Sequence, residues 1–214
     1  MAAILSVHAP IQAISTISGN QENIFNFQEG SSQTFNNGTP VILSSGVLIA
    51  STSPLSTTNK LTGIAVYPGH NLGSAGKGAS PVFGSIGFPG GAPTFGTVPN
   101  QSSAVNLLHG SPFVDGLMLT QLAVDDTIFE VQVDNSTGTA GAAGIADVGQ
   151  YAALLTDANN WWYLDRNTLA TTPGTLPCVI VSLNPQDLVV GSTTTQVTNG
   201  RVRVKFLPQV QTLP

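Results

Sequence analysis

Short apolar runs, each bounded by turn-forming residues, recur along this chain, and hardly any of them has the spacing of an amphipathic helix. Runs in which apolar and polar residues alternate are typical of β-strands that bury one face. Strands at regular spacing predict an all-β (mainly β) fold, with short antiparallel strands forming a barrel or a sandwich. The expected strands lie within residues 40–50, 60–66, 116–124, 127–133, 160–165, 177–183 and 200–208.

Two of these regions predict strand pairs. Residues 40–50 read as two short strands around a Ser-Ser-Gly turn. The runs at residues 116–124 and 127–133 flank Asp125 and Asp126, which is the arrangement expected of a β-hairpin.

A helical turn is expected at one place at most. Residues 148–158, with the sequence VGQYAALLTDA, are compatible with a helical turn. Residues 151–155 within them fit a strand equally well, so both interpretations stay open at this level.

The chain divides into three expected regions. Residues 1–30 contain scattered apolar residues without a clear pairing partner, and we expect an extended N-terminal arm that lies over another subunit or over the body of the fold. Residues 31–112 form an N-terminal β region with a long Gly/Pro-rich loop at 68–112. Residues 113–214 form a C-terminal β-barrel or sandwich domain.

The Gly/Pro-rich loop carries aromatic side chains at Phe83, Phe88 and Phe95. Free linkers are rich in small polar residues, so aromatic residues spaced among glycines favour a loop that inserts them into a partner or into its own core. Glycine lets such a loop follow an irregular surface without the steric cost of a Cβ atom. The three phenylalanines are therefore candidate interface residues.

The start of this loop, YPGHNLGSAGKGAS at residues 67–80, invites comparison with a phosphate-binding loop. A P-loop needs G-x-x-x-x-G-K-[ST], so that backbone N–H groups surround the phosphates. Here Asn71 stands where the first glycine belongs, and Gly78 follows Lys77 in place of a hydroxyl residue. We therefore expect a structural loop and no nucleotide cofactor.

Charged residues make up only 8% of the chain, whereas an average soluble domain carries about a quarter. The net charge of −5 provides no basic surface for nucleic acid. A charge-poor surface suits a protein that is largely covered by other subunits, either copies of itself or a different protein.

Cys178 is the only cysteine, so the chain has no intramolecular disulfide and no thiolate metal site. The N-terminus lacks the cationic region of a signal peptide, and no apolar run approaches the length needed to span a bilayer. We expect synthesis in a cytoplasm and no membrane partner.

Half of the six cationic residues lie in the segment RVRVK, where Arg201, Arg203 and Lys205 alternate with valines. On a strand, the three cations share one face and the valines point inward. This face is either solvated or pairs with carboxylates of a neighbouring chain, and we include the three cations among the candidate interface residues.

No set of residues predicts catalysis or a metal site. Asp125, Asp126 and Glu130 are the densest carboxylate group, but adjacent aspartates are favoured in turns, where they hydrogen-bond the backbone. The histidines lack metal-ligand spacing, and the nucleophile motif G-x-S-x-G is absent. The sequence thus predicts a protein that is not an enzyme and has no cofactor. The histidines are His8, His70 and His109.

Trp161, Trp162 and Tyr163 are the one candidate platform for a sugar ring. On a strand, Trp161 and Tyr163 share one face while Trp162 takes the other, so a core or interface role is favoured.

Three segments carry a family resemblance: residues 94–133, residues 147–165 and residues 200–208. Their spacings Asn-Gln-x-Ser-Ala-Val-Asn, Asp-Asp-Thr-x-Phe and Asp-Val-Gly resemble the capsid cement, or decoration, proteins of tailed bacteriophages. Residues 36–48 and 61–72 are similar to the N-terminal half of that group, and the resemblance covers most of residues 30–208.

The resemblance implies a β-rich virion structural protein that forms oligomers, with a homotrimer favoured. It implies a location on the outer surface of the phage head, where such proteins bridge subunits of the major capsid protein and stabilise the shell against DNA pressure. It carries no active site. The alternative is a carbohydrate- or receptor-binding module of a phage tail or fibre, with Trp161–Tyr163 as the contact.

Overall fold

The computed structural model describes residues 9–17, 24–29, 33, 35–55, 57, 60–66, 117–124, 126–135 and 141–211. Within these residues the chain forms strands β1 to β11 and three 3-10 turns, without an α-helix. The predicted all-β fold is therefore confirmed.

The first structural unit is a closed barrel. Its strand order is β7-β11-β10-β8-β9, and β9 pairs back with β7. This closing contact is parallel, through Val133 with Leu164 and Asp134 with Asp165, whereas the other pairings in the barrel are antiparallel. Strand β1 adds to β7 outside the closed ring. The bounds are β1 (Gln12–Thr16), β7 (Thr127–Asp134), β8 (Tyr151–Thr156), β9 (Trp162–Ala170), β10 (Cys178–Leu183) and β11 (Arg201–Phe206).

The barrel interior follows directly from the alternation of apolar residues along its strands. On β11, Val202, Val204 and Phe206 are fully buried, while the residues between them are only half-buried. The ring of Phe206 packs edge-to-face on Phe129 of β7, with the ring centroids 5.2 Å apart. Aromatic pairs in this geometry add attraction beyond their buried area.

The second unit is an antiparallel sheet with the order β2-β6-β5-β3-β4. Its two edge strands, β2 and β4, approach each other: Glu29, just after β2, forms a β-bridge with Leu48 of β4. The expected strand pair within residues 40–50 is confirmed as β3 and β4. The bounds are β2 (Ile24–Gln28), β3 (Pro40–Ser44), β4 (Val47–Ala50), β5 (Leu61–Ala65) and β6 (Leu117–Leu122).

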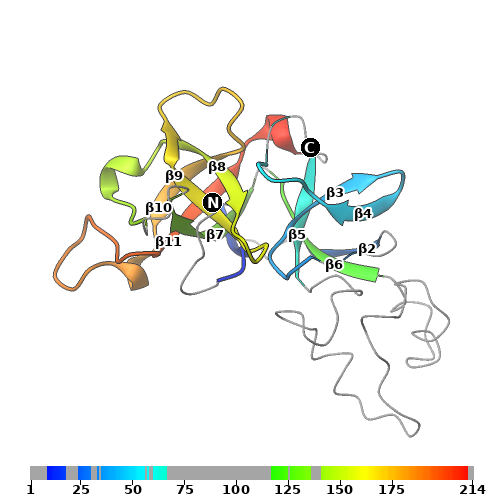
Figure 1. Cartoon of the computed structure of the whole chain (residues 1–214), viewed down its shortest axis with the longest axis horizontal. Helices are drawn as coiled ribbons and strands as arrows, with labels where there is room; N and C mark the ends of the chain where they lie inside the picture. The colour runs from blue at the N-terminus through cyan, green and yellow to red at the C-terminus, as the bar shows by residue number, and fades with distance from the viewer. Residues whose placement is uncertain are drawn as a thin grey trace, which may run out of the picture.

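The barrel and the second sheet lie side by side along the long axis of the molecule (Figure 1). Leu55, between β4 and β5, forms a bridge with Leu154 of β8, and Leu61 of β5 forms a bridge with Gln211. Leu55 and Leu61 belong to the same buried cluster as the barrel interior. The barrel core therefore extends into the second unit, whose other buried apolar residues, including Val41, Leu48 and Met118, form a cluster of their own.

The expected hairpin between residues 116–124 and 127–133 is wrong. Both runs are strands, but β6 lies in the second sheet and β7 lies in the barrel. The N–H of Ala123 donates to Thr62 and holds the end of β6 on β5, whereas Asp126 accepts from Ile17 beside β1. The short connection thus crosses from one sheet to the other, and Asp125 lies outside the described residues.

The two open interpretations are also resolved in part. Residues 151–155 form strand β8, and the only helical turn nearby is the 3-10 turn Ile145–Asp147. Strands β1 and β2 pair with β7 and β6, so the described parts of the expected arm lie on the body of the chain's own fold. The predicted boundary between residues 112 and 113 lies outside the described residues; the change of sheet occurs between β6 and β7.

Candidate functional site

The predicted cation face exists on the outside of the barrel. Arg201, Arg203 and Lys205 are half-buried and alternate with the buried apolar residues of β11. β11 lies between β7 and β10, which place Glu130 opposite Arg203 and Val179 opposite Lys205. The three cations therefore share a face, as their spacing predicts.

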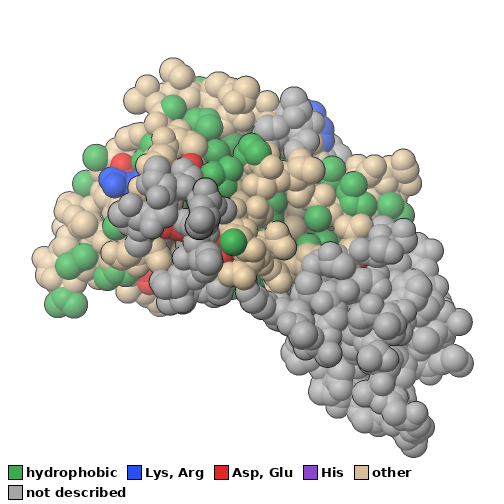
Figure 2. All heavy atoms as spheres, viewed as in Figure 1, with side chains coloured by type: hydrophobic (Ala, Val, Ile, Leu, Met, Phe, Trp, Pro, Cys, Tyr) green, Lys and Arg blue, Asp and Glu red, His purple; other side chains and the backbone are tan. Residues whose placement is uncertain are grey.

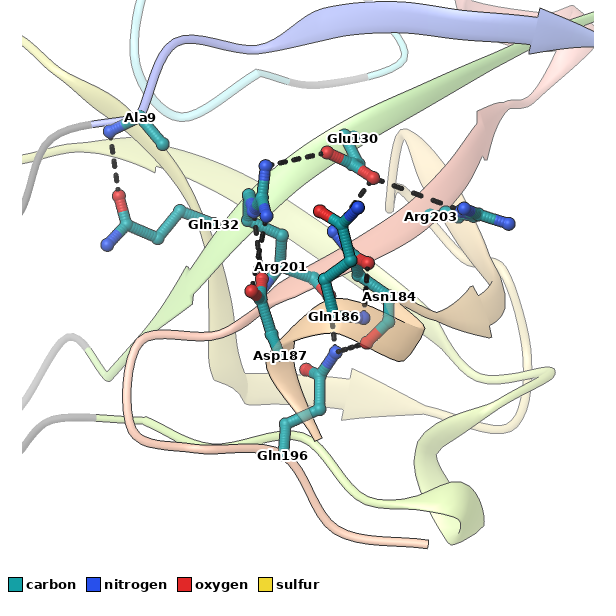
Figure 3. A network of polar contacts seen from close by, with 9 residues as sticks. All are labelled: Ala9, Glu130, Gln132, Asn184, Gln186, Asp187, Gln196, Arg201 and Arg203. Carbon is teal, nitrogen blue, oxygen red and sulfur yellow. Dashed lines mark hydrogen bonds and ion pairs between the residues drawn. The ribbon is translucent and has the colours of Figure 1, made fainter. Parts of the chain in front are cut away.

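Arg201 forms ion pairs with Asp187 and Glu130 of its own chain (Figure 3). Its Nε and Nη2 donate to Oδ2 and Oδ1 of Asp187 at 2.8 and 3.1 Å, and its Nη1 donates to Oε2 of Glu130 at 3.0 Å. The guanidinium holds the pKa of Asp187 below its ordinary value, and the Asp187 carboxylate raises the pKa of Arg201. Bidentate pairs of this kind fix orientation as well as supply energy.

Asn184 and Gln196 extend this network around the base of the segment that precedes β11. Asn184 Nδ2 donates to Oε1 of Glu130 at 2.9 Å, and its Oδ1 accepts from the N–H of Gln186, which caps the 3-10 turn Pro185–Asp187. Gln196 Nε2 donates to the backbone oxygens of Asn184 and Arg201 (Figure 3). The network braces residues 188–200 against the barrel.

Sequence reasoning missed this network, because its members are spread over several elements. The Asn184-Pro185 pair is one local signal that was available, since Asn before Pro is a typical start of a capped turn. Gln132, whose Oε1 accepts from the N–H of Ala9 at 3.0 Å, gives no such signal.

Arg203 and Lys205 make fewer contacts within the described part of the chain than Arg201 does. Arg203 Nε lies 3.9 Å from Oε1 of Glu130, too far for a hydrogen bond, and has no acceptor among the described residues. Lys205 likewise has no ion pair within the described part of the chain. The interface role of these two cations and of Arg201 stays a prediction.

An exposed apolar loop stands beside the network. Val190 is fully exposed, and Val189, Val197 and Ile145 are exposed as well. Residues 188–197 carry no charge. The loop that they form is orange in Figure 1, and green apolar side chains lie at its tip in the same view in Figure 2. The loop is ordered by a hydrogen bond within it, from Val189 N–H to Thr195 O at 2.9 Å, and by one from the neighbouring 3-10 turn, from Ile145 N–H to Thr194 O at 2.7 Å.

The proposed sugar platform is buried. Trp161 and Tyr163 pack with Leu155, while Trp162 joins the barrel core; their exposed fractions are 8%, 1% and 4%. The alternation predicted from the strand is correct, and the core interpretation of the three aromatic residues is confirmed.

Three buried carboxylates, Asp134, Asp157 and Asp165, lie near Tyr163. Burial is the main cause that raises the pKa of Asp134, and the charges of the other two aspartates add to it. Burial and the same charges raise the pKa of Tyr163 to about 12. Asp157 Oδ1 accepts from the N–H groups of Asn159 and Trp161, so it orders the β8–β9 turn.

The other residues considered for catalysis, metal binding or an interface lie partly inside and partly outside the described ranges. Glu130 belongs to the Arg201 network, and Asp126 lies in a turn. Burial raises the pKa of the Cys178 thiol to about 12. Among the described residues, no group of three or more His, Cys, Asp and Glu side chains is arranged to hold a metal ion. Outside the described residues lie Phe83, Phe88, Phe95, His8, His70 and His109.

No helix within the described ranges is long and apolar enough to cross a bilayer. Comparison of the chain with protein-family models, with curated proteins and with solved structures finds no match in any of the three.

Proposed function

We propose that this chain is a non-enzymatic virion structural protein, a capsid cement or decoration protein of a tailed bacteriophage. It binds the outer surface of the head, bridges subunits of the major capsid protein and stabilises the shell against DNA pressure. We further propose that it assembles with copies of itself, as a homotrimer, and contacts neither DNA nor membrane directly.

One observation carries the proposal: an ordered, uncharged loop exposes apolar side chains on a charge-poor barrel. Exposed apolar groups on a rigid loop are typical of protein–protein contacts, because their burial on binding is favourable and little conformational entropy is lost. Val190, fully exposed at this loop, is the clearest example. Arg203 and Lys205 lie on the outer face of the same barrel and add donors for a partner's carboxylates.

The ionisable clusters support a structural role. Arg201 binds Asp187 and Glu130 and thereby braces the loop, and Asp157 caps a turn. The resemblance of residues 94–133, 147–165 and 200–208 to decoration proteins points the same way. The tail or fibre module is less well supported, since its proposed aromatic contact is buried.

The test uses heads that lack the protein. We expect them to release DNA at a lower temperature than complete heads, and added wild-type protein to restore the release temperature. Val190→Asp should bind heads more weakly, because a carboxylate at the contact would have to be desolvated. Thr172→Asp, an exposed substitution in the β9–β10 connection, is the matched control and should restore the heads.

Equal release temperatures with and without the wild-type protein would contradict the proposal. Copy number separates the alternatives: a decoration protein is present in amounts comparable with the major capsid protein, whereas a tail module is present in far fewer copies per particle.

A further inference from the structure

A hollow of about 400 Å³ opens where the barrel meets the second sheet. One wall comes from the end of β8 and the β8–β9 turn, with Thr156, Asn160 and Trp162. The other wall comes from the segment before β3, from the end of β4 and from the segment after β4. Its volume lies in the range of small-molecule sites, which are commonly found where two structural units meet.

The walls of this hollow are held in place by hydrogen bonds. Ser53 Oγ accepts from the N–H of Thr156 at 3.0 Å, and Gln33 Oε1 accepts from the N–H of Ala50 at 3.0 Å. Asn36 Nδ2 donates to the backbone oxygens of Asn159 and Asn160 in the β8–β9 turn. A site with fixed walls loses little entropy when a ligand binds.

The chemistry of the lining is uniform and uncharged. Buried Phe35 and Trp162 supply apolar surface, and hydroxyl and amide side chains supply groups that can both donate and accept hydrogen bonds. None of these lining residues is charged, so the hollow offers no opposite charge to a charged ligand. The polar lining residues are Gln33, Thr39, Ser51, Ser53, Thr156 and Asn160.

One lining group lacks a hydrogen-bond partner. Ser51 Oγ is buried, and no described residue bonds to it; the whole residue is 8% exposed. A buried hydroxyl without a partner costs about 1–3 kcal/mol, and native proteins rarely leave such a group unmatched. Ser51 Oγ itself has almost no accessible surface, so a ligand hydroxyl in the hollow would supply the missing partner once the Ser51 side chain turns toward it.

We propose that this seam hollow binds one neutral saccharide unit of a glycan. Sugar hydroxyls are paired donors and acceptors, so they match the hydroxyl and amide groups of the lining. Phe35 and Trp162 are 7% and 4% exposed, so they border the hollow with small apolar edges and offer no stacking face. This site is separate from the exposed loop at residues 188–197, and the inference does not rest on the proposed capsid role. On a particle with many copies, weak sites of this kind would act together through avidity.

The test is an NMR titration of the full chain with methyl glycosides of glucose, galactose, mannose and N-acetylglucosamine, each added separately. We expect at least one of them to give saturable shifts at the Trp162 indole N–H, the Gln33 and Asn160 side-chain amides and the Ser51 backbone N–H. Glycerol at the same concentration is the solvent control and should not reproduce these shifts.

Two variants make the result specific to the hollow. Ser51→Ala should weaken binding about fivefold through loss of one hydrogen bond, while leaving the melting temperature unchanged or higher, because the buried hydroxyl has no partner to lose. Ala50→Leu should abolish binding by occupying the hollow, and Thr172→Ala should bind as the wild type does. The inference is overturned if no glycoside gives saturable shifts at these groups, if glycerol gives the same shifts, or if both hollow variants bind like the wild type.

Discussion

At the scale of single residues, Arg201 and Arg203 show how neighbours of one type on one strand face can differ in role. Arg201 makes short hydrogen bonds to two carboxylates that are themselves partly or largely buried, whereas Arg203 only approaches one of them. Removing one partner of a buried pair is costly because the remaining charge stays buried without compensation.

Arg201→Gln should therefore lower the free energy of unfolding by about 2 kcal/mol, since this pair is only partly buried. Arg203→Gln, two residues away on the same face, should lower it by less than about 1 kcal/mol. Urea unfolding at neutral pH measures both. A similar loss for the two variants would mean that the short contacts of Arg201 add nothing to stability.

Asp187 and Asp134 should have opposite effects on the pH dependence of stability. The pKa of Asp187 is held below 3.8 in the folded state, so its contribution is present above that value and is lost as the pH falls through the folded pKa. The pKa of Asp134 is raised above 3.8, so its contribution is fully present below that value and is lost as the pH rises through the raised pKa.

Asp187→Asn is accordingly expected to destabilise the fold at pH 7, with a difference from wild type that shrinks in acid. Asp134→Asn should stabilise the fold at pH 7, and its advantage should also disappear in acid. Melting temperatures between about pH 3 and pH 7 test both expectations. A destabilised Asp134→Asn variant at pH 7 would show that the ionised carboxylate is favourable where it lies.

At the scale of elements, most strands outside the expected arm were predictable, whereas the β3–β4 pairing was the one strand partnership that the sequence predicted correctly. The alternation in RVRVK reports only which side chains point inward, and the structure agrees with it. Whether β6 turns back on β7 depends on backbone hydrogen bonds to Thr62 and Ile17, which lie far away in the sequence. The Arg201 network has the same origin, because β7, the Pro185–Asp187 turn and β11 meet only in the folded barrel.

The β3–β4 turn offers a test of backbone preference alone. Ser45 and Gly46 both have positive φ, 50° and 84°, as in a type I′ turn, and both are exposed. Ser45→Asn should raise the free energy of unfolding by about 0.5 kcal/mol, because Asn tolerates this region better. Gly46→Ala should lower it by about 1–2 kcal/mol through backbone strain, since no atom lies within 4 Å of the added Cβ. Thermal unfolding that ranks the two variants in the reverse order would contradict this account.

At the scale of the whole molecule, the barrel and the second sheet behave in our interpretation as one cooperative unit. Leu55 is the clearest link, since it leaves the second sheet, forms a bridge with Leu154 and is buried in the barrel core. A shared core couples the unfolding of the parts that contribute to it.

Leu55→Ala should lower the free energy of unfolding by about 2–4 kcal/mol, because it leaves a cavity in the core. The variant should still unfold in a single transition, because that cavity lies where the two units meet. Circular dichroism and Trp fluorescence should report the same midpoint, with the fluorescence arising from Trp161 and Trp162 in the barrel. Two separate midpoints in the wild-type chain would show that the units unfold independently.

The pairing of the first two strands has a consequence for the order of events during synthesis. β1 and β2 find their partners on β7 and β6, which the ribosome makes only after residues 67–116. Contacts between such distant segments slow folding, because a long loop must close before they form. β1 and β2 therefore cannot pair while only the N-terminal part of the chain has been made. Their apolar side chains stay uncovered until most of the polypeptide has left the exit tunnel.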